Sequence, residues 1–263
     1  MAEFKTWEDY QYPAPDEYTL RNKLGIRDFF ELRELEYKMT AKRETQLRAG
    51  IYEVPRTFDA DHVRAIHGHL FKDLYAWAGE FRVVNMRKPD NELPFVSPRN
   101  EGIERYLEEM KETIASHSWV GMDRDQFAFA AAKSFTVLNW AHPFREGNGR
   151  TSRIFMDHLA ERAGFGLDRT RIDKDLWNAS ARDTRPRAPG AAPSFEPMVS
   201  VFKEMTTTRE EASTVSVSHA IARSSILQAS YPRAASAALT TPTSTQTRAA
   251  QSGPDKSVGL GRD

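Results

Sequence analysis

Apolar residues recur every three or four positions through most of residues 1–205, and this spacing constrains the fold more than any other feature of the sequence. A segment with this pattern forms a helix with one apolar face, which has to pack against a neighbouring element. We predict helices near residues 28–48, 59–74, 97–114, 123–141, 148–164, 174–181 and 195–205. The chain is therefore expected to be all-α, a helical bundle.

Several of these helices carry residues that mark their ends. Asp123 and Gln126 have the spacing of a capping box. Pro98 suits the first helical position, so we expect a helix to begin there. Pro143 prevents the helix before it from continuing, and Gly164 suits the position just after a helix end.

Residues 81–96 depart from the helical pattern. Strand-favouring residues flank the turn-forming segment Lys88-Pro89-Asp90-Asn91, which predicts a β-hairpin. A single hairpin cannot build a core of its own. We therefore expect a small flap that projects from the bundle.

The composition changes near residue 205. Of the 58 residues from 206 to 263, 19 are Ser or Thr and 10 are Ala, and the last Phe is Phe202. Such a segment has too little apolar surface to offset the conformational entropy that folding would cost. We expect one folded domain over residues 1–205 and a low-complexity, disordered tail over 206–263, with room for a short helix near 218–228.

Charge and cysteine content exclude several classes of function. The formal net charge is +0, from 37 basic and 37 acidic residues, which gives no general attraction to nucleic acid or to an anionic membrane. The absence of cysteine excludes disulfides, thiolate nucleophiles and cysteine-ligated zinc. No apolar stretch approaches the roughly 20 residues that span a bilayer, and the N-terminus lacks the apolar region of a secretory signal. A soluble cytoplasmic protein is expected.

The chemistry is concentrated in residues 142–153, which read His-Pro-Phe-Arg-Glu-Gly-Asn-Gly-Arg-Thr-Ser-Arg. Gly147 and Gly149 can adopt positive φ, so successive N–H groups can point into one concavity at a helix N-terminus. Such a concavity binds anions. Arg150 and Arg153 are expected to share a helix face beside it, which suggests more than one phosphate.

Three further side chains of this segment complete the expected site. Glu146 would be repelled by phosphate unless a divalent cation lay between them, and Mg²⁺ commonly binds one carboxylate together with phosphate oxygens and water. His142 can accept a proton near neutral pH, and Phe144 is expected to anchor the loop in the core. These residues predict phosphoryl-type chemistry, with a base facing a metal-bound polyphosphate.

The segment resembles the Fic family motif HxFx[D/E]GNGRxxR at every defined position. Residues 20–25 and 77–82 also resemble stretches that precede this motif in bacterial Fic toxins, the class I members of the family. The resemblance covers roughly residues 10–205. It implies a Fic-type helical bundle and a protein adenylyltransferase, which moves AMP from ATP to a protein hydroxyl and releases pyrophosphate.

The resemblance also implies a role for each motif residue. His142 is the expected base that deprotonates a Tyr, Ser or Thr hydroxyl, and Phe144 is the expected buried anchor. Glu146 is expected to hold Mg²⁺ against the α- and β-phosphates of ATP. The phosphates themselves are expected to be bound by the cradle residues Gly147, Asn148 and Gly149 and by Arg150 and Arg153.

The flap is expected to dock the target by strand pairing. The residues that the resemblance assigns to this docking are Val84, Asn85, Met86, Phe95 and Val96.

Gly149 favours adenylyl transfer, because Doc-like kinases of the family carry Lys at this position. A kinase, a transferase of another nucleotide or of phosphocholine, and a non-catalytic module that binds nucleotide remain the alternatives.

Partners and regulation follow from the same resemblance. Family members are often blocked by a helix with the motif [S/T]xxxE[G/N], whose Glu pairs with the residue equivalent to Arg153. Residues 97–102 match this motif, but we attribute the match to coincidence at an ordinary helix start. We expect a bacterial cytoplasmic toxin restrained by a separate small antitoxin, with a secreted effector as the second interpretation. The expected target is a protein such as a topoisomerase subunit or a host GTPase.

Overall fold

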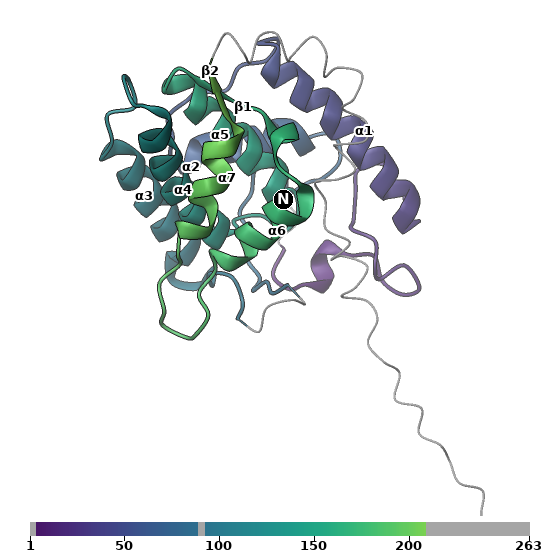
Figure 1. Cartoon of the computed structure of the whole chain (residues 1–263). Helices are drawn as coiled ribbons and strands as arrows, with labels where there is room; N and C mark the ends of the chain where they lie inside the picture. The colour runs from purple at the N-terminus through teal and green to yellow at the C-terminus, as the bar shows by residue number, and fades with distance from the viewer. Residues whose placement is uncertain (1–3, 89–92, 209–263) are drawn as a thin grey trace, which may run out of the picture.

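The computed structural model describes residues 4–88 and 93–208 and confirms a mainly helical fold (Figure 1). The α-helices are α1 (Phe29–Arg48), α2 (Ala60–Phe71), α3 (Gly102–Ala115), α4 (Arg124–Ala141), α5 (Asn148–Arg162), α6 (Lys174–Asp183) and α7 (Glu196–Met205). The short 3-10 helices are η1 (Glu8–Tyr10), η2 (Arg99–Glu101) and η3 (Arg169–Arg171).

Most of the predicted helix ends are confirmed. Asp123 accepts a hydrogen bond from the Gln126 N–H, and the Gln126 side chain accepts one from the Asp123 N–H, so α4 begins with the predicted capping box. Gly164 has a φ of 81° directly after Ala163, the residue that caps α5, as the left-handed position after a helix requires.

The predicted start of α3 is wrong. The helix begins at Gly102 and not at Pro98, because Asn100 and Glu101 both adopt left-handed backbone conformations, with φ of 53° and 56°. The Ser97 hydroxyl accepts a hydrogen bond from the Arg99 N–H at 3.2 Å and so forms a local turn instead of a helix cap.

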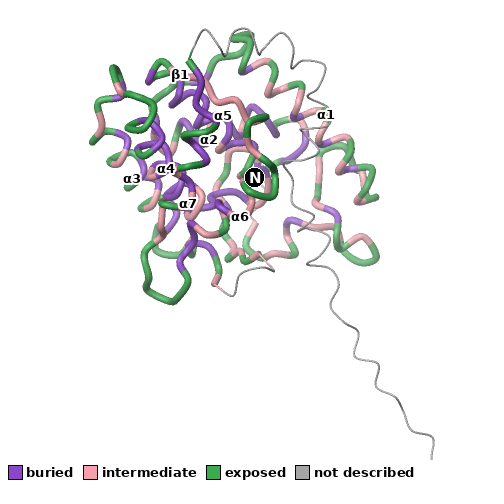
Figure 2. The backbone as a smooth tube through the Cα atoms, viewed as in Figure 1, coloured by how far each residue is buried: buried purple, intermediate pink, exposed green. Residues whose placement is uncertain are grey.

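α4 is the centre of the fold and packs against α3, α5 and α7. Figure 2 shows it as a largely buried helix, whereas α1 lies at the periphery with most of its length exposed or half-buried. Small side chains such as Ala128 and Ala131, both fully buried, allow the neighbouring helices to approach closely. α2 packs against α5, and α1 packs in turn against α2.

A two-stranded antiparallel sheet extends the folded region past residue 205. β1 (Phe165–Leu167) pairs with β2 (Thr206–Thr208), with Phe165 opposite Thr208. Thr206 and Thr207 are both 2% exposed, so the packed region continues from α7 into β2, past the predicted boundary at residue 205. The rest of the predicted tail, including the segment 218–228, lies outside the described residues.

The described parts of the predicted hairpin, residues 81–88 and 93–96, carry no assigned strand. The Phe95 N–H donates a hydrogen bond to the Met86 carbonyl at 2.8 Å and joins the two arms. The predicted turn at its tip extends into residues 89–92, which lie outside the described residues. Throughout residues 4–88 and 93–208, the helices are too short or too polar to cross a bilayer.

Candidate active site

The loop between α4 and α5 is built by its own sequence. α4 ends at Ala141 because His142 turns into a left-handed conformation with a φ of 42°, ahead of Pro143. The Asn148 side chain then bridges the loop: its Oδ1 accepts from the Phe144 N–H at 2.9 Å, and its Nδ2 donates to the Phe144 carbonyl at 2.7 Å. Asn148 therefore braces the loop from within.

The two glycines of the motif differ in their structural roles. Gly147 has a φ of 81°, and a Cβ atom there would lie 2.3 Å from two ring carbons of Phe71. Gly149 lies in the first turn of α5, where its φ is not positive and a Cβ atom would meet no described neighbour within 4 Å. At Gly149 the backbone is helical, and other residues can adopt this conformation. At Gly147 both the positive φ and the close approach of the Phe71 ring require glycine.

His67 on α2 packs against the loop and hydrogen-bonds to it, a role that sequence analysis missed. Its ring stacks on the fully buried Phe144, with centroids 3.8 Å apart. The Gly79 N–H donates to His67 Nδ1 at 2.8 Å, so His67 Nε2 carries the proton and donates to the Glu146 carbonyl at 3.1 Å. Burial lowers the pKa of His67 to about 3 and keeps the ring neutral.

A cavity of about 1010 Å³ opens beside this loop. It is lined from the motif by His142, Glu146, Gly147 and Arg153, from the flap by Met86, Lys88 and Phe95, and from α6 by Trp177. Of the five flap residues expected to dock a target, Met86 and Phe95 line the cavity, while Val84 is half-buried, Asn85 is exposed and Val96 is buried, all three outside it.

His142 is the first residue of the motif loop and lies against the flap. Its ring is stacked on Phe95, with centroids 3.8 Å apart and planes 8° from parallel, and the residue is 9% exposed. Burial lowers the pKa of His142 well below 6.5, and the positive charges of Lys88, Arg82 and Arg185 lower it further. The imidazole is therefore neutral at physiological pH and able to accept a proton.

Arg82 ties the flap to the motif, and the sequence analysis also missed this residue. Its guanidinium is 1% exposed and donates to the carbonyls of His142 at 2.8 Å, Val84 at 2.7 Å and Val96 at 2.6 Å. These bonds span both arms of the flap and the end of α4. The sequence signal was an arginine in an extended segment, which on its own is most often a solvated residue.

Arg150 and Arg153 both turn toward α1, but they differ in their access to the cavity. Arg150 is 2% exposed, does not line the cavity, and donates to Glu36 Oε1 at 2.5 Å and Thr40 Oγ1 at 3.0 Å. α1 supplies a buried carboxylate, Glu36, for this guanidinium. Phosphate binding by Arg150 stays a prediction.

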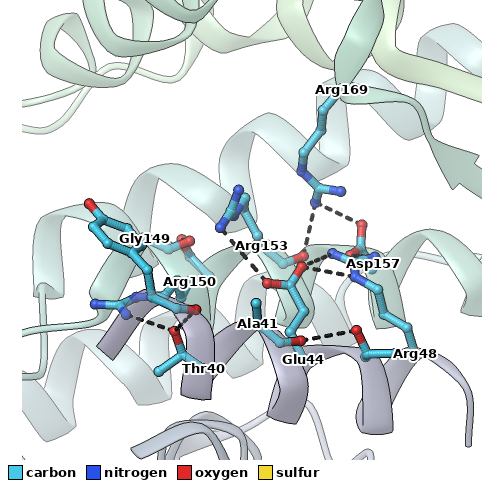
Figure 3. A network of polar contacts seen from close by, with 12 residues as sticks. Thr40, Ala41, Glu44, Arg48, Gly149, Arg150, Arg153, Asp157 and Arg169 are labelled. Atoms are coloured by element: carbon cyan, nitrogen blue, oxygen red, sulfur yellow. Dashed lines mark hydrogen bonds and ion pairs between the residues drawn. The ribbon is translucent and has the colours of Figure 1, made fainter. Parts of the chain in front are cut away.

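Arg153 lines the cavity and belongs to a second polar network (Figure 3). Its Nη2 lies 4.0 Å from Glu44 Oε2 on α1. Arg169 donates to the Arg153 carbonyl at 3.0 Å and to Asp157 at 2.7 Å, and Arg48 pairs with Asp157. Burial lowers the pKa of Arg153 to about 10, so the side chain stays charged at neutral pH.

Glu146 presents a carboxylate to the cavity, with 34% of its side chain exposed. No cluster of three or more His, Cys, Asp or Glu that could hold a metal by itself is found within residues 4–88 and 93–208. A single carboxylate fits Mg²⁺, which binds through one or two protein carboxylates and completes its shell with phosphate oxygens and water. Glu146 therefore has the chemistry and the access to hold Mg²⁺ together with a polyphosphate.

Comparison with known proteins agrees with this geometry. The model of the Fic/DOC family matches residues 57–160. A probable protein adenylyltransferase Fic of Escherichia coli is 32% identical over 174 residues, which cover 65% of this chain and 81% of that protein. The protein adenylyltransferase VbhT of Bartonella schoenbuchensis is 34% identical over 164 residues, which cover 62% of this chain, but the match spans 33% of its own length.

The fold has solved counterparts as well. The crystal structure of the BepC protein of Bartonella tribocorum, with bound AMPPNP, has a TM-score of 0.67 and 29% identity, and the match covers 77% of this chain and 98% of that one. AMPPNP is the ligand of that protein, and its presence there is consistent with a nucleotide site in this fold.

Proposed function

Because the chain belongs to the Fic/DOC family, we propose that it is a protein adenylyltransferase that transfers AMP from ATP to a hydroxyl group of another protein. The single observation that carries the proposal is the position of His142. His142, the loop that leads into α5 and Arg153 all line the same cavity. This arrangement supports a base and an anion-binding helix start that act on one bound nucleotide.

The neutral His142 ring accepts the proton of a target Tyr, Ser or Thr hydroxyl as its oxygen bonds to the α-phosphorus of ATP. The bond between the α-phosphorus and the bridging oxygen breaks, and pyrophosphate leaves. The N–H groups at the start of α5 and the Arg153 guanidinium stabilise the negative charge on the phosphates. Glu146 would hold Mg²⁺, whose charge offsets that of the phosphates.

The flap is assigned to the target protein. The arms of the flap around Met86 and Phe95 border the cavity next to His142. Strand addition to such an arm would place a target hydroxyl near the imidazole without a specific pocket for every side chain. Met86 and Phe95 are the residues that we propose contact the target, whereas Arg82 holds the arms in place.

The decisive experiment is transfer of label from α-labelled ATP to protein. His142→Ala should lower this transfer by about 10²–10⁴, the usual loss when a general base is removed. His117→Ala is the matched control, since that histidine lies outside the cavity. Equal transfer by wild type and His142→Ala would disprove the assignment, and retention of label from γ-labelled ATP alone would identify a kinase.

We also propose a bacterial toxin that a separate small antitoxin restrains, with a topoisomerase subunit or a host GTPase as the target class. The relatives named as protein adenylyltransferases in Bartonella and Escherichia coli support a bacterial origin. The toxin role, the antitoxin and the target class follow from the resemblance of residues 142–153 to the family motif. Expression of the wild type should arrest bacterial growth, and expression of His142→Ala should not. Growth arrest by both proteins would separate toxicity from AMP transfer.

A further inference from the structure

A carboxylate outside the motif is buried against the motif arginine. Glu36 lies in the middle of α1 and is 8% exposed. Its Oε1 accepts a hydrogen bond from Arg150 Nη2 at 2.5 Å, and its Oε2 accepts a short hydrogen bond from the Tyr75 hydroxyl. Both oxygens of this carboxylate are therefore held by side chains from other parts of the fold.

The same guanidinium also contacts the carboxylate that faces the cavity. Arg150 Nη2 lies 3.3 Å from Glu146 Oε1, so one nitrogen of Arg150 lies between two carboxylates, one from α1 and one from the motif loop. The Phe71 ring lies against the guanidinium at 4.5 Å, and Thr40 accepts from Nη1. The Arg150 guanidinium is therefore held in contact with both carboxylates.

Arg150, Glu36 and Glu146 together carry an excess of one negative charge when both carboxylates are ionised. Arg150 carries one positive charge, and Glu36 and Glu146 carry one negative charge each when ionised. Glu36 is the more buried partner and makes the shorter contact, so it neutralises most of the Arg150 charge. Glu146, with a third of its side chain exposed, then keeps its own charge directed at the cavity.

We propose that Glu36 is a positioning residue for the reaction: it neutralises Arg150, so that the Glu146 carboxylate retains the charge that binds Mg²⁺ with ATP. This inference rests on the proposed function, because it assigns Mg²⁺ to Glu146. It gives Arg150 an indirect role: the guanidinium orients Glu146 from behind and does not touch the nucleotide. Without Glu36, Arg150 would become the counter-ion of Glu146 and compete with the metal.

The test measures Mg²⁺ dependence and not activity alone. Binding of a non-hydrolysable ATP analogue is followed by calorimetry as Mg²⁺ is raised from zero, with EDTA as the starting point. Glu36→Gln should raise the Mg²⁺ concentration for half-maximal binding about tenfold, as expected when a supporting group behind a metal ligand is lost. Binding in EDTA should be no weaker than in the wild type. The matched control is Glu34→Gln, an exposed carboxylate on the same helix that pairs with Lys38.

A second variant separates charge balance from a loss of folding. In the double variant Glu36→Leu with Arg150→Met, both buried charges are removed and Glu146 keeps its own, so half-maximal binding should return to within about threefold of the wild-type Mg²⁺ concentration. Buried ion pairs replaced together by apolar side chains commonly leave a protein folded. Circular dichroism melts of each variant confirm that the protein being titrated is folded.

Each outcome decides the matter. A wild-type Mg²⁺ requirement in a folded Glu36→Gln variant overturns the inference, and so does a double variant that needs as much Mg²⁺ as the single one. Weaker analogue binding by the double variant in EDTA would show that Arg150 contacts phosphate, which also overturns it. If the wild type and both Glu36 variants transferred AMP with the same Mg²⁺ requirement, the proposed function would stand and the role of Glu36 would fall. If the wild type did not bind the analogue with Mg²⁺, both would fall.

Discussion

At the scale of single residues, the acid–base behaviour of His142 depends on what covers it. Phe95 stacks on the ring, and three cationic side chains oppose its protonation. An ordinary solvated histidine would titrate near 6.5. His142 thus has two roles: it ends α4, and its surroundings keep its own imidazole neutral.

The depressed pKa of His142 predicts a specific pH profile for AMP transfer. The neutral ring is the form that we propose accepts the proton, and its pKa lies well below 6.5. We therefore expect kcat/KM to stay level as the pH falls through 6.5 and to decline only at lower pH. Phe95→Ala should admit water and move the decline up toward pH 6.5. Val83→Ala, at a flap side chain that is 52% exposed, should leave the profile unchanged. A decline at the same pH in wild type and Phe95→Ala would show that Phe95 has no such effect.

Gly147 and Gly149 form a matched pair for testing why the motif contains glycine. Gly147→Ala should destabilise the fold by roughly 2–4 kcal/mol, because its Cβ would overlap the Phe71 ring at a positive φ. Gly149→Ala should leave stability equal or raise it by about 0.5–1 kcal/mol, as Ala replaces Gly within a helix. Urea denaturation of both variants measures the difference. Equal free energies of unfolding would contradict the contact at Phe71.

At the scale of elements, α1 supplies more of the site than its sequence pattern indicates. Its apolar residues predicted an ordinary amphipathic helix. Its polar residues Glu36 and Thr40 hold Arg150, and Glu44 faces Arg153. The helix therefore contributes the electrostatic environment of both motif arginines, although it lies at the edge of the molecule (Figure 1).

α2 and α5 are joined by a buried pair of histidines. The Phe58 N–H donates to His62 Nδ1 at 3.3 Å, so His62 Nε2 donates to His158 Nδ1 at 2.9 Å and both rings are neutral. Burial is the main cause that lowers the pKa of His62 to about 3 and that of His158 to about 4. In the unfolded chain both titrate near 6.5.

This pair predicts a loss of stability in mild acid. Because the folded pKa values are depressed, the contribution of the pair is complete above pH 6.5 and is lost as the pH falls from 6.5 toward about 4. The melting temperature should drop by roughly 5 °C or more between pH 7 and pH 5. The double variant His62→Leu with His158→Leu should show a smaller drop. An identical drop in the double variant would place the acid sensitivity elsewhere.

At the scale of the whole molecule, β2 joins the C-terminal end of α7 to β1, which follows α5. The Asp168 N–H donates to the Met205 carbonyl at 2.8 Å, and Thr206–Thr208 then pair with β1. A chain truncated after residue 208 should melt at the temperature of the full chain. One truncated after residue 205 should lose roughly 1–3 kcal/mol of stability, since it removes two buried threonines and a strand pair. Equal melting temperatures for the two truncations would show that β2 contributes nothing.

The sequence by itself determined the helices, the capping box of α4 and the glycine after α5, and the types of residue at the site. These features are local: periodicity and caps act over a few residues, and the segment 142–153 holds a base, a carboxylate and two arginines together. The false helix start at Pro98 marks the limit of such reasoning, because a turn and a cap use the same polar residues.

The tertiary structure alone decided how those residues are used. Arg150 meets Glu36 across 114 positions of sequence, and His67 meets the Glu146 carbonyl across 79. No local pattern encodes such a contact, since it depends on which helix faces packing brings together. Burial then fixes the outcome: an arginine that would be solvated on an isolated helix becomes a buried counter-ion, and a histidine that would titrate near neutrality becomes a neutral base.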